Sequence, residues 1–421
     1  MLWLVAAYGV IRLLHLWLLS EGLDGQIQTG PGTAAGTQGA SLYETLGVWD
    51  GGWYLTIADD GYPDQLSLIS VREDSTASLV FPPLYPLAMR ALGLLGLPTL
   101  AAGLLLSALA GLAAVVGVYA VARDLLSRSA AWLTAVLWAA GPMTIVLTMA
   151  YSEALFVALA AWALWFLRRE WWLTAGLLGL LGGLTRSTGL AVGAALVTAA
   201  VLTIRRGHAS GRSQRRLPAP VVPDDDLPGV DADRVGRHGA WRPMVGAGLA
   251  VIGVPLWWVY VAVVSGRVDG WFAAQEFFWG SRFDFGASVL RNGWRMLAFE
   301  GRFDPMTRFV YTLSFFAMVV AIALLFALVA HVSRSRQLVA AVTGWWPVAT
   351  YAAVLVVLAV GSAGYPHSKM RFLVPMFPLL LLPAARIARL GRGAQATIVG
   401  VLAVTTGWLG AYMLTVWPYA I

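Results

Sequence analysis

The sequence predicts an all-α polytopic membrane protein in which residues 1–421 form a single integral membrane domain. Hydrophobic residues make up 59% of the chain, the mean hydropathy is +0.71, and only 12% of the residues are charged. One soluble globule could not bury so many apolar side chains, so most of the chain must use lipid as its solvent. The chain has no cysteine, which excludes disulfide bonds and thiolate metal sites.

Apolar stretches recur along the whole chain, and a spanning helix needs about 20 mostly apolar residues. We expect about eleven transmembrane helices, at residues 3–19, 99–122, 130–148, 151–168, 171–185, 188–204, 244–265, 308–330, 345–361, 372–388 and 396–416. The first stretch lacks a basic leader and a small-residue cleavage site, so we expect a retained span there. The apolar stretch 83–97 is short and is interrupted by Pro83, Pro86 and Arg90, which favours a re-entrant or surface-lying helix.

The distribution of arginine predicts the orientation. With the N-terminus in the cytoplasm, the arginine clusters fall in cytoplasmic connections and the first outer loop is acidic. This assigns residues 20–98 to a first extracytoplasmic loop with amphipathic helices, 206–243 to a flexible cytoplasmic loop, and 266–307 to a second large extracytoplasmic loop. Residues 29–41 have the composition of a linker. The net charge of +7 is then a topology signal, and no nucleic-acid partner is expected.

The first outer loop contains the stretch WDGGWYLTIADDGYP, in which Asp50 lies between tryptophans and beside two glycines. A helix that starts near Asp50 would bring Trp49, Trp53 and Ile57 to one side, next to Tyr54, as in a helix that lies in the membrane interface. Two compatible interpretations of Asp50 are open. It could be an N-cap that accepts backbone N–H bonds, or a positioned general base with room left by the glycines.

Three further features are expected at the same face. The stretch FPPLYP fixes the backbone with three prolines and offers the ring of Tyr85, which suits a sugar, a prenyl chain or an ordinary interfacial turn. Glu153 begins a predicted span, where a carboxylate is costly without a partner or a task. Arg186 lies in the next outer turn and could approach Glu153. A structural ion pair and phosphate binding by Arg186 are both open.

A late outer turn, YPHSKMRF, contains His367, Lys369 and Arg371. Basic side chains on the outer face depart from the positive-inside trend, so an anionic ligand would explain them. A lipid-linked phosphate is the obvious candidate, and a plain anchor to anionic headgroups is the alternative.

Taken together, WDGGWYLTIADDGYP, VFPPLYP, PMTIVLTMAYSEALF, GLTRSTGL and HSKMRFLVPMFP resemble the PIG-V family of mannosyltransferases of glycosylphosphatidylinositol assembly and its bacterial relatives. These motifs cover most of the chain in the family's order. The family is similar to the wider GT-C class, which implies a GT-C-like arrangement of helices, a polyprenyl-phosphate sugar donor and a catalytic carboxylate in the first outer loop. The resemblance implies that Asp50 is catalytic and places Glu153, Arg186 and Arg371 at motif positions.

The chain departs from the family pattern at the insertion 29–41, at the arginine-rich loop 206–243 and at VFPPLYP, where Phe-Phe-Pro is commoner. Its arginine-rich, nearly lysine-free composition resembles that of a high-GC bacterium. We therefore expect a bacterial cell-membrane protein whose acceptor is a glycolipid, lipoglycan or secreted glycoprotein, in place of the eukaryotic anchor.

The predicted function is that of an inverting glycosyltransferase that moves a sugar, expected to be mannose, from a polyprenyl phosphate to this acceptor on the extracytoplasmic face. The catalytic and juxtamembrane helices would lie in the loop 20–98. Because Arg or Lys can neutralise the leaving phosphate, no metal or other cofactor is expected. A transporter or flippase of a polyprenyl-linked sugar is the alternative, and it predicts charges at mid-membrane depth and internal symmetry. The predicted site has Asp50 as general base, Arg186, His367, Lys369 and Arg371 at the donor phosphate, and Trp49, Trp53, Tyr54, Tyr85 and Glu153 in support.

Overall fold

The computed structural model describes residues 1–29, 40–63, 74–214, 240–334 and 344–421. These residues are helical apart from connections, and their one extended pairing is a single bridge between Phe283 and Ser362. The elements, with η for short 3₁₀ helices, are α1 (Leu2–Thr29), α2 (Leu42–Thr45), α3 (Asp50–Asp60), η1 (Asp74–Val80), α4 (Leu84–Gly93), α5 (Thr99–Arg123), α6 (Arg128–Ala139), η2 (Thr144–Leu147), α7 (Glu153–Leu167), α8 (Trp172–Gly183), η3 (Ser187–Gly189), α9 (Leu190–Gln214), α11 (Trp241–Ser265), α12 (Gly270–Trp279), α13 (Ala287–Leu297), α14 (Pro305–Arg334), α16 (Trp345–Gly361), η4 (His367–Leu373), η5 (Phe377–Leu380), α17 (Leu381–Ile387) and α18 (Arg392–Thr415).

Six helices of the described chain are long and apolar enough to cross a membrane, namely α1, α5, α9, α11, α14 and α18. A seventh crossing results if the pair His367–Leu373 and Phe377–Ile387, which is bent by 73°, is one span. The apolar helices α7, α8 and α16 have only 15, 12 and 17 residues. The polytopic membrane class is therefore confirmed, while the predicted count of about eleven spans stays a prediction.

Two of the predicted spans are broken where proline interrupts them. In the range 130–148, α6 ends at Ala139, just before Gly141-Pro142, and the chain resumes as η2. In the range 372–388, Pro375 lies between η4 and η5, and Pro378 is the second residue of η5, which is followed directly by α17. Proline lacks the N–H that a continuous helix needs, so apolar length alone overestimates the straight helix at both places.

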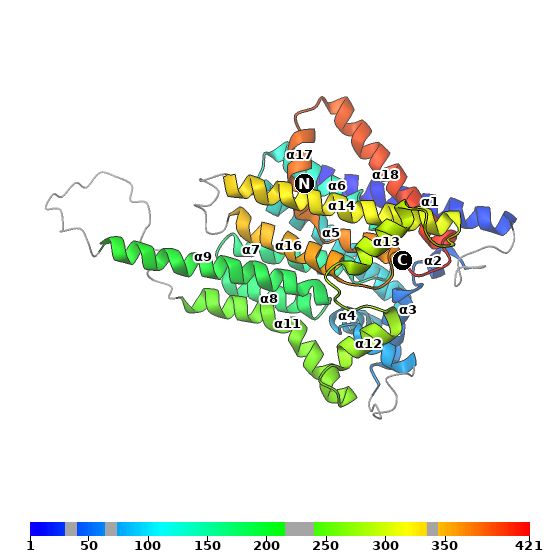
Figure 1. The fold of residues 1–421 in the computed structure, drawn as a ribbon, viewed down its shortest axis with the longest axis horizontal. Helices are drawn as coiled ribbons and strands as arrows, with labels where there is room; N and C mark the ends of the chain where they lie inside the picture. The colour runs from blue at the N-terminus through cyan, green and yellow to red at the C-terminus, as the bar shows by residue number, and fades with distance from the viewer. Residues whose placement is uncertain (30–39, 64–73, 215–239, 335–343) are drawn as a thin grey trace.

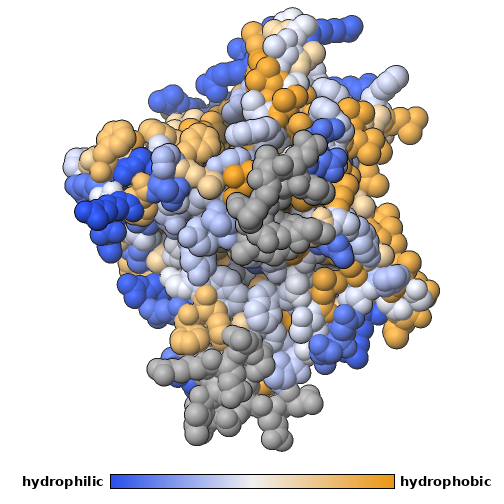
Figure 2. Space-filling view, turned by 90° about the vertical axis from the view of Figure 1, so that its right-hand side faces the viewer, coloured by the Kyte–Doolittle hydropathy of each residue, from blue (hydrophilic) through white to orange (hydrophobic). Residues whose placement is uncertain are grey.

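The long helices form the frame that carries the site. In Figure 1, α14, α16 and α9 run alongside one another, and α8 and α11 lie on the other side of α9. Helix α1 packs along α18, and α7 packs between α5 and α8. The short helices α3, α4, α12 and α13 gather toward one end of this frame (Figure 1). Figure 2 views that end, where hydrophobic side chains gather at the top and along the right-hand side and strongly hydrophilic side chains lie at the left edge.

Small residues let α8 and α11 pack closely. A Cβ added at Gly176 would lie 2.4 Å from the Gly246 carbonyl oxygen, and one added at Gly253 would lie 2.4 Å from that of Leu180. Such contacts are shorter than van der Waals distance, so only glycine fits. Lipid supplies no hydrophobic drive for helices to associate, and close backbone packing through small residues takes its place.

Two polar side chains fix α1 inside the bundle. The buried guanidinium of Arg12 donates to the carbonyls of Ala139 and Thr144, where α6 ends and η2 begins. His15 Nε2 lies 3.1 Å from the Ala403 carbonyl oxygen of α18. These partners explain how an apolar helix tolerates an arginine and a histidine, since buried polar groups must be hydrogen-bonded.

The structure describes only part of the loops that the sequence predicts. The linker predicted at 29–41 lies mostly outside the described residues, as does that at 206–243, of which 206–214 form the end of α9. The stretch 83–97 contains the ten-residue α4, which begins directly after Pro83. Residues 266–307 contain α12 and α13. The side of the membrane on which each loop lies stays a prediction.

Candidate active site

Asp50 is the first residue of α3, and Trp49 is the residue at the N-cap. No side chain caps this helix and the Asp50 carboxylate contacts a distant arginine, so the N-cap interpretation of Asp50 is wrong. Trp49 has a φ of 59°, and a residue other than glycine held in such a sparsely populated conformation costs about 1–3 kcal/mol. The following glycine is not forced by a close contact, since a Cβ at Gly51 would lie 3.5 Å from the Ala150 carbonyl oxygen. The local strain therefore lies directly before Asp50.

The Asp50 carboxylate begins a chain of alternating charges. Its Oδ2 lies 2.7 Å from Nη1 of Arg371 in η4. Nε of Arg371 lies 3.1 Å from Oε1 of Glu153, and Nη1 of Arg186 lies 2.9 Å from the same oxygen. All four side chains are at most 13% exposed. Because ions with so little solvent need their partners, these contacts fix the four groups relative to one another.

Tyr151, two residues before Glu153, contacts the backbone of Asp50. Its hydroxyl accepts a hydrogen bond from the Asp50 backbone N–H at 3.2 Å. The Arg371 guanidinium carbon lies 5.4 Å from the centre of the Tyr151 ring, a cation–π distance. Tyr151 therefore contacts both members of the Asp50–Arg371 ion pair.

Ser152 connects Arg186 to the helix that carries Asp50. Its hydroxyl accepts from Nη1 of Arg186 at 2.9 Å and lies 2.7 Å from the hydroxyl of Tyr54, one turn after Asp50 in α3. Burial raises the pKa of the Tyr54 phenol above its usual value, so this group stays protonated and can donate. Glu153 follows at the first position of α7, where the helix dipole favours a carboxylate.

A cavity of about 430 Å³ opens beside these groups. Asp50, Arg186, Lys369 and Arg371 all line it, as does Arg282, so its wall has more cationic than anionic side chains. The rest of the wall is rich in aromatic and aliphatic side chains, which include Trp258, Trp271, Phe272, Trp279, Phe283 and Leu358. Volume and chemistry match a ligand with one anionic and one apolar part.

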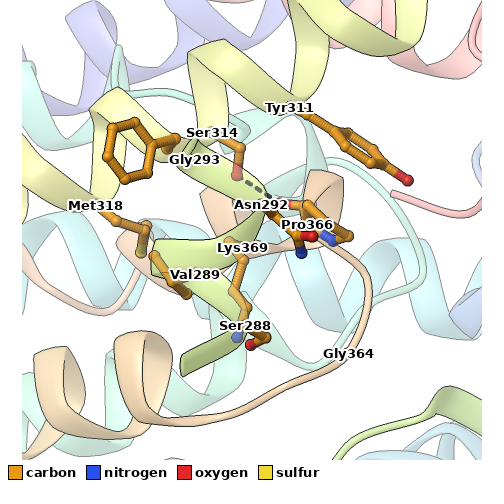
Figure 3. A pocket seen from close by; sticks show the side chains of 11 residues that line it. Ser288, Val289, Asn292, Gly293, Tyr311, Ser314, Met318, Gly364, Pro366 and Lys369 are labelled. Carbon is orange, nitrogen blue, oxygen red and sulfur yellow. Dashed lines mark hydrogen bonds between the residues drawn. The ribbon is translucent and has the colours of Figure 1, made fainter. Parts of the chain in front are cut away.

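Lys369 lines this cavity, but its ammonium is already engaged. It donates to the carbonyl oxygen of Ala359 at 2.9 Å and to that of Ser362, at the end of α16. A cation at a helix C-terminus satisfies carbonyls that have no helical partner. Lys369 also lines a second, much smaller pocket of about 20 Å³ together with Ser288, which Figure 3 shows. The predicted role of Lys369 at a phosphate has to compete with these backbone contacts.

His367 does not line the cavity. It is 2% exposed and lies among aromatic rings, with centroids 5.2 to 6.1 Å from its own, from Tyr311, Tyr365, Trp417 and Tyr419. Three of these rings come from segments outside the turn that supplies His367. The predicted contact of His367 with the donor phosphate therefore has no support from its position.

The predicted supporting residues separate into two groups. Tyr54 lines the cavity, and Trp53 stacks against Phe81, another lining residue, at 6.2 Å between ring centres. Tyr85 is fully buried, and its hydroxyl bonds the Gly103 carbonyl and Ser107, away from the cavity. Ile57 is also buried. The helix predicted to lie in the interface, α3, packs against α4, α5 and η1, and Trp53 contacts the rings of Phe81 and Trp279.

Several lining residues escaped the sequence interpretation. Trp258 belongs to a predicted span, and Trp271 and Trp279 belong to a loop without a motif. Tyr151 and Ser152, which contact Asp50 and Arg186, were not predicted either, although they directly precede Glu153 in the sequence and this position could have indicated their role. Within the described residues no three His, Asp or Glu side chains are placed to hold a metal ion. The expectation that the reaction needs no metal stays a prediction.

Comparison with known proteins relates part of the chain to glycosyltransferases. Residues 81–213 match the model of the family described as dolichyl-phosphate-mannose-protein mannosyltransferase. A search of curated proteins finds no match. Among solved structures the chain is similar to the apo oligosaccharyltransferase of Archaeoglobus fulgidus, with 11% identity and a TM-score of 0.47. That comparison covers 99% of this chain and 56% of the other, so this chain spans about half of its length.

The family match contains Glu153 and Arg186, whereas Asp50 precedes it and Arg371 follows it. The finer PIG-V resemblance and the bacterial origin stay predictions. The chain is a multi-pass membrane protein whose residues 81–213 are similar to a family of mannosyltransferases.

Proposed function

We propose that this protein is an inverting glycosyltransferase that moves a sugar, with mannose as the first candidate, from a polyprenyl-phosphate donor to an acceptor hydroxyl. One observation carries the proposal. An immobilised carboxylate, Asp50, faces a cavity whose wall is cationic in one part and aromatic in another. The similarity of residues 81–213 to a mannosyltransferase family supports the same class of reaction.

Asp50 would act as the general base. Its Oδ2 is held by Arg371, and Oδ1 has no hydrogen-bond partner among the residues that the structure describes. The acceptor hydroxyl would give its proton to Asp50 while its oxygen forms the new bond to the anomeric carbon. The bond from that carbon to the phosphate oxygen breaks, and the electron pair leaves with the polyprenyl phosphate. A positioned base contributes about 10²–10⁴ in rate, and one displacement inverts the anomeric configuration.

The two kinds of cavity wall suit the two parts of the donor. Guanidinium groups form charge-assisted bonds to phosphate oxygens, which would hold the phosphate of the donor in the cationic part of the cavity. The aromatic and aliphatic part, with Trp258 from α11 and Leu358 from α16, suits a prenyl chain that arrives sideways from lipid. In this scheme the base and the cations that meet the phosphate are side chains of the protein.

The cellular setting is part of the proposal. Arginine-rich connections favour a cytoplasmic N-terminus and an extracytoplasmic site in a bacterial cell membrane. The acceptor would be a glycolipid, lipoglycan or secreted glycoprotein, all of which offer hydroxyl groups on that face.

The decisive experiment mixes the protein, in lipid nanodiscs, with decaprenyl-phosphate mannose that is labelled in the sugar, and with a lipid extract as acceptor. An enzyme releases free decaprenyl phosphate while label appears in the acceptor fraction. A transporter or flippase, in contrast, leaves the donor intact and only changes the leaflet in which it lies. Intact donor after prolonged incubation, with several polyprenyl-phosphate hexoses and pentoses tried, would overturn the proposal.

A further inference from the structure

The two arginines that meet at Glu153 differ in how much of each guanidinium the protein uses. Arg371 contacts Asp50 at 2.7 Å and the Ile421 carbonyl oxygen at 2.9 Å through Nη1, and Glu153 at 3.1 Å through Nε. Arg186 contacts Glu153 and Ser152, each at 2.9 Å, through Nη1 alone. Both side chains line the cavity, with exposed fractions of 10% for Arg371 and 13% for Arg186.

The unused donors point to different tasks. A guanidinium has five N–H donors in a planar fork. For Arg186, Nε and Nη2 have no partner within the described part of the chain, so three N–H groups remain beside the cavity. Such an open fork matches the geometry of two phosphate oxygens. For Arg371, Nη1 has two partners and Nε lies in the ion pair with Glu153, so only the two N–H groups of Nη2 lack a partner within the described residues.

The charges around each arginine support the same assignment. Arg371 lies between two carboxylates, Asp50 and Glu153, so a third anion at Arg371 would meet two negative charges at hydrogen-bond distance from the same group. Arg186 contacts only Glu153, and it shares that carboxylate with Arg371. A guanidinium attracts an incoming phosphate more strongly when fewer carboxylates already neutralise its charge.

We propose that Arg186 binds the donor phosphate and that Arg371 is a positioning residue, which fixes the Asp50 carboxylate for proton transfer. This inference rests on the proposed glycosyl transfer, and it divides between two residues a task that their similar chemistry would otherwise assign to both. Glu153 connects the tasks, because its one oxygen Oε1 sets the separation of the two guanidinium groups.

The experiment compares Arg186→Gln with Arg371→Gln in nanodiscs, by measuring kcat and the donor KM. Arg186→Gln is expected to raise the donor KM by about 10-fold to 100-fold, the loss of one or two charge-assisted bonds, with kcat within about 3-fold. Arg371→Gln is expected to lower kcat by about 100-fold, because the base loses its fixed geometry, with the donor KM within about 3-fold. Arg371→Lys keeps a cation beside Asp50 and should recover part of the lost kcat.

A binding measurement without turnover uses farnesyl phosphate as the probe. Its affinity should fall about 10-fold or more in Arg186→Gln and stay within about 3-fold of wild type in Arg371→Gln. Arg169→Gln is the matched control, because Arg169 pairs with Asp124 beyond the far end of α7. Thermal melting in the same nanodiscs identifies any variant that is unfolded, and the lysine variant then replaces it.

The outcomes separate this inference from the proposed function. If both glutamine variants change the same parameter, or if Arg371→Gln alone weakens farnesyl phosphate, the division of tasks is wrong. Wild-type-like transfer by Asp50→Asn overturns the proposed function itself. If Asp50→Asn is inactive but Arg186→Gln and Arg371→Gln change the same kinetic parameter, only the division of tasks between the two arginines is overturned.

Discussion

Replacing Glu153 by glutamine is expected to destabilise the protein by about 3 kcal/mol, at the lower end of the cost of breaking a buried ion pair. The Glu153 side chain is only 2% exposed, and its Oε1 lies 2.9 Å from Arg186 and 3.1 Å from Arg371. Glutamine keeps the shape of the side chain and one acceptor. It removes the negative charge that separates two guanidinium groups, which then repel each other with little solvent between them.

A matched control lies in the same protein. Glu276 pairs with Arg282 at the same distance of 2.9 Å, but these side chains are 54% and 67% exposed. Exposed ion pairs contribute about 1 kcal/mol or less, since water already solvates both charges. Glu276→Gln should therefore leave stability almost unchanged. The two variants share the substitution and a contact of 2.9 Å to an arginine, and they differ in burial and in the second arginine partner that only Glu153 has.

Thermal unfolding in detergent, followed by tryptophan fluorescence, measures the difference. Glu153→Gln should lower the apparent Tm by about 5 °C or more, and Glu276→Gln by less than about 2 °C. Raising the salt concentration should reduce the already small effect at Glu276 and leave the effect at Glu153. Equal shifts for the two variants would refute the argument that burial makes the Glu153 network a structural requirement.

Three further outcomes follow from the packing. Gly253→Ala places a Cβ 2.4 Å from the Leu180 carbonyl oxygen and should cost about 1–3 kcal/mol of stability in unfolding experiments. Gly248→Ala in the same helix meets nothing within 4 Å and should be neutral or stabilising. Equal costs would contradict the close α8–α11 packing. Tyr85→Phe should cost about 1 kcal/mol of stability and leave kcat and KM unchanged, and a loss of turnover without a loss of stability would return Tyr85 to the active site. Lys369→Met should lower the Tm, because the carbonyls at the end of α16 lose their hydrogen-bond donor. It should raise the KM for the sugar donor less than Arg186→Gln does. A larger rise in this KM would show that the Lys369 ammonium reaches the phosphate.

The sequence was informative where chemistry is local or where chain order fixes proximity. Hydropathy predicts the membrane class, and the helix from Asp50 follows from its pattern of aromatic residues. The approach of Arg186 to Glu153 was predictable because they lie at consecutive turns on the same predicted face, and the structure confirms it at 2.9 Å. Spacing along neighbouring helices was sufficient for that pair.

Contacts between distant segments could not be predicted in this way. Arg371 joins Asp50 to Glu153, although it follows them by hundreds of residues, and nothing in its own turn reveals these partners. The same turn supplies His367, which enters an aromatic cluster instead, because Trp417 and Tyr419 cover it. Three neighbouring basic residues therefore have three different surroundings, which depend on the packing of α16 and the C-terminal segment.

Transfer by Asp50→Asn, measured in nanodiscs with labelled decaprenyl-phosphate mannose, shows whether the Asp50 carboxylate is the general base. Asp60→Asn is the matched control, because Asp60 is an exposed carboxylate at the other end of the same helix. If Asp50 is the base, Asp50→Asn lowers kcat by about 10²–10⁴ while farnesyl phosphate still binds, and Asp60→Asn transfers the sugar at a near-normal rate. Normal transfer by Asp50→Asn, with the label in the same product, would contradict this role of Asp50.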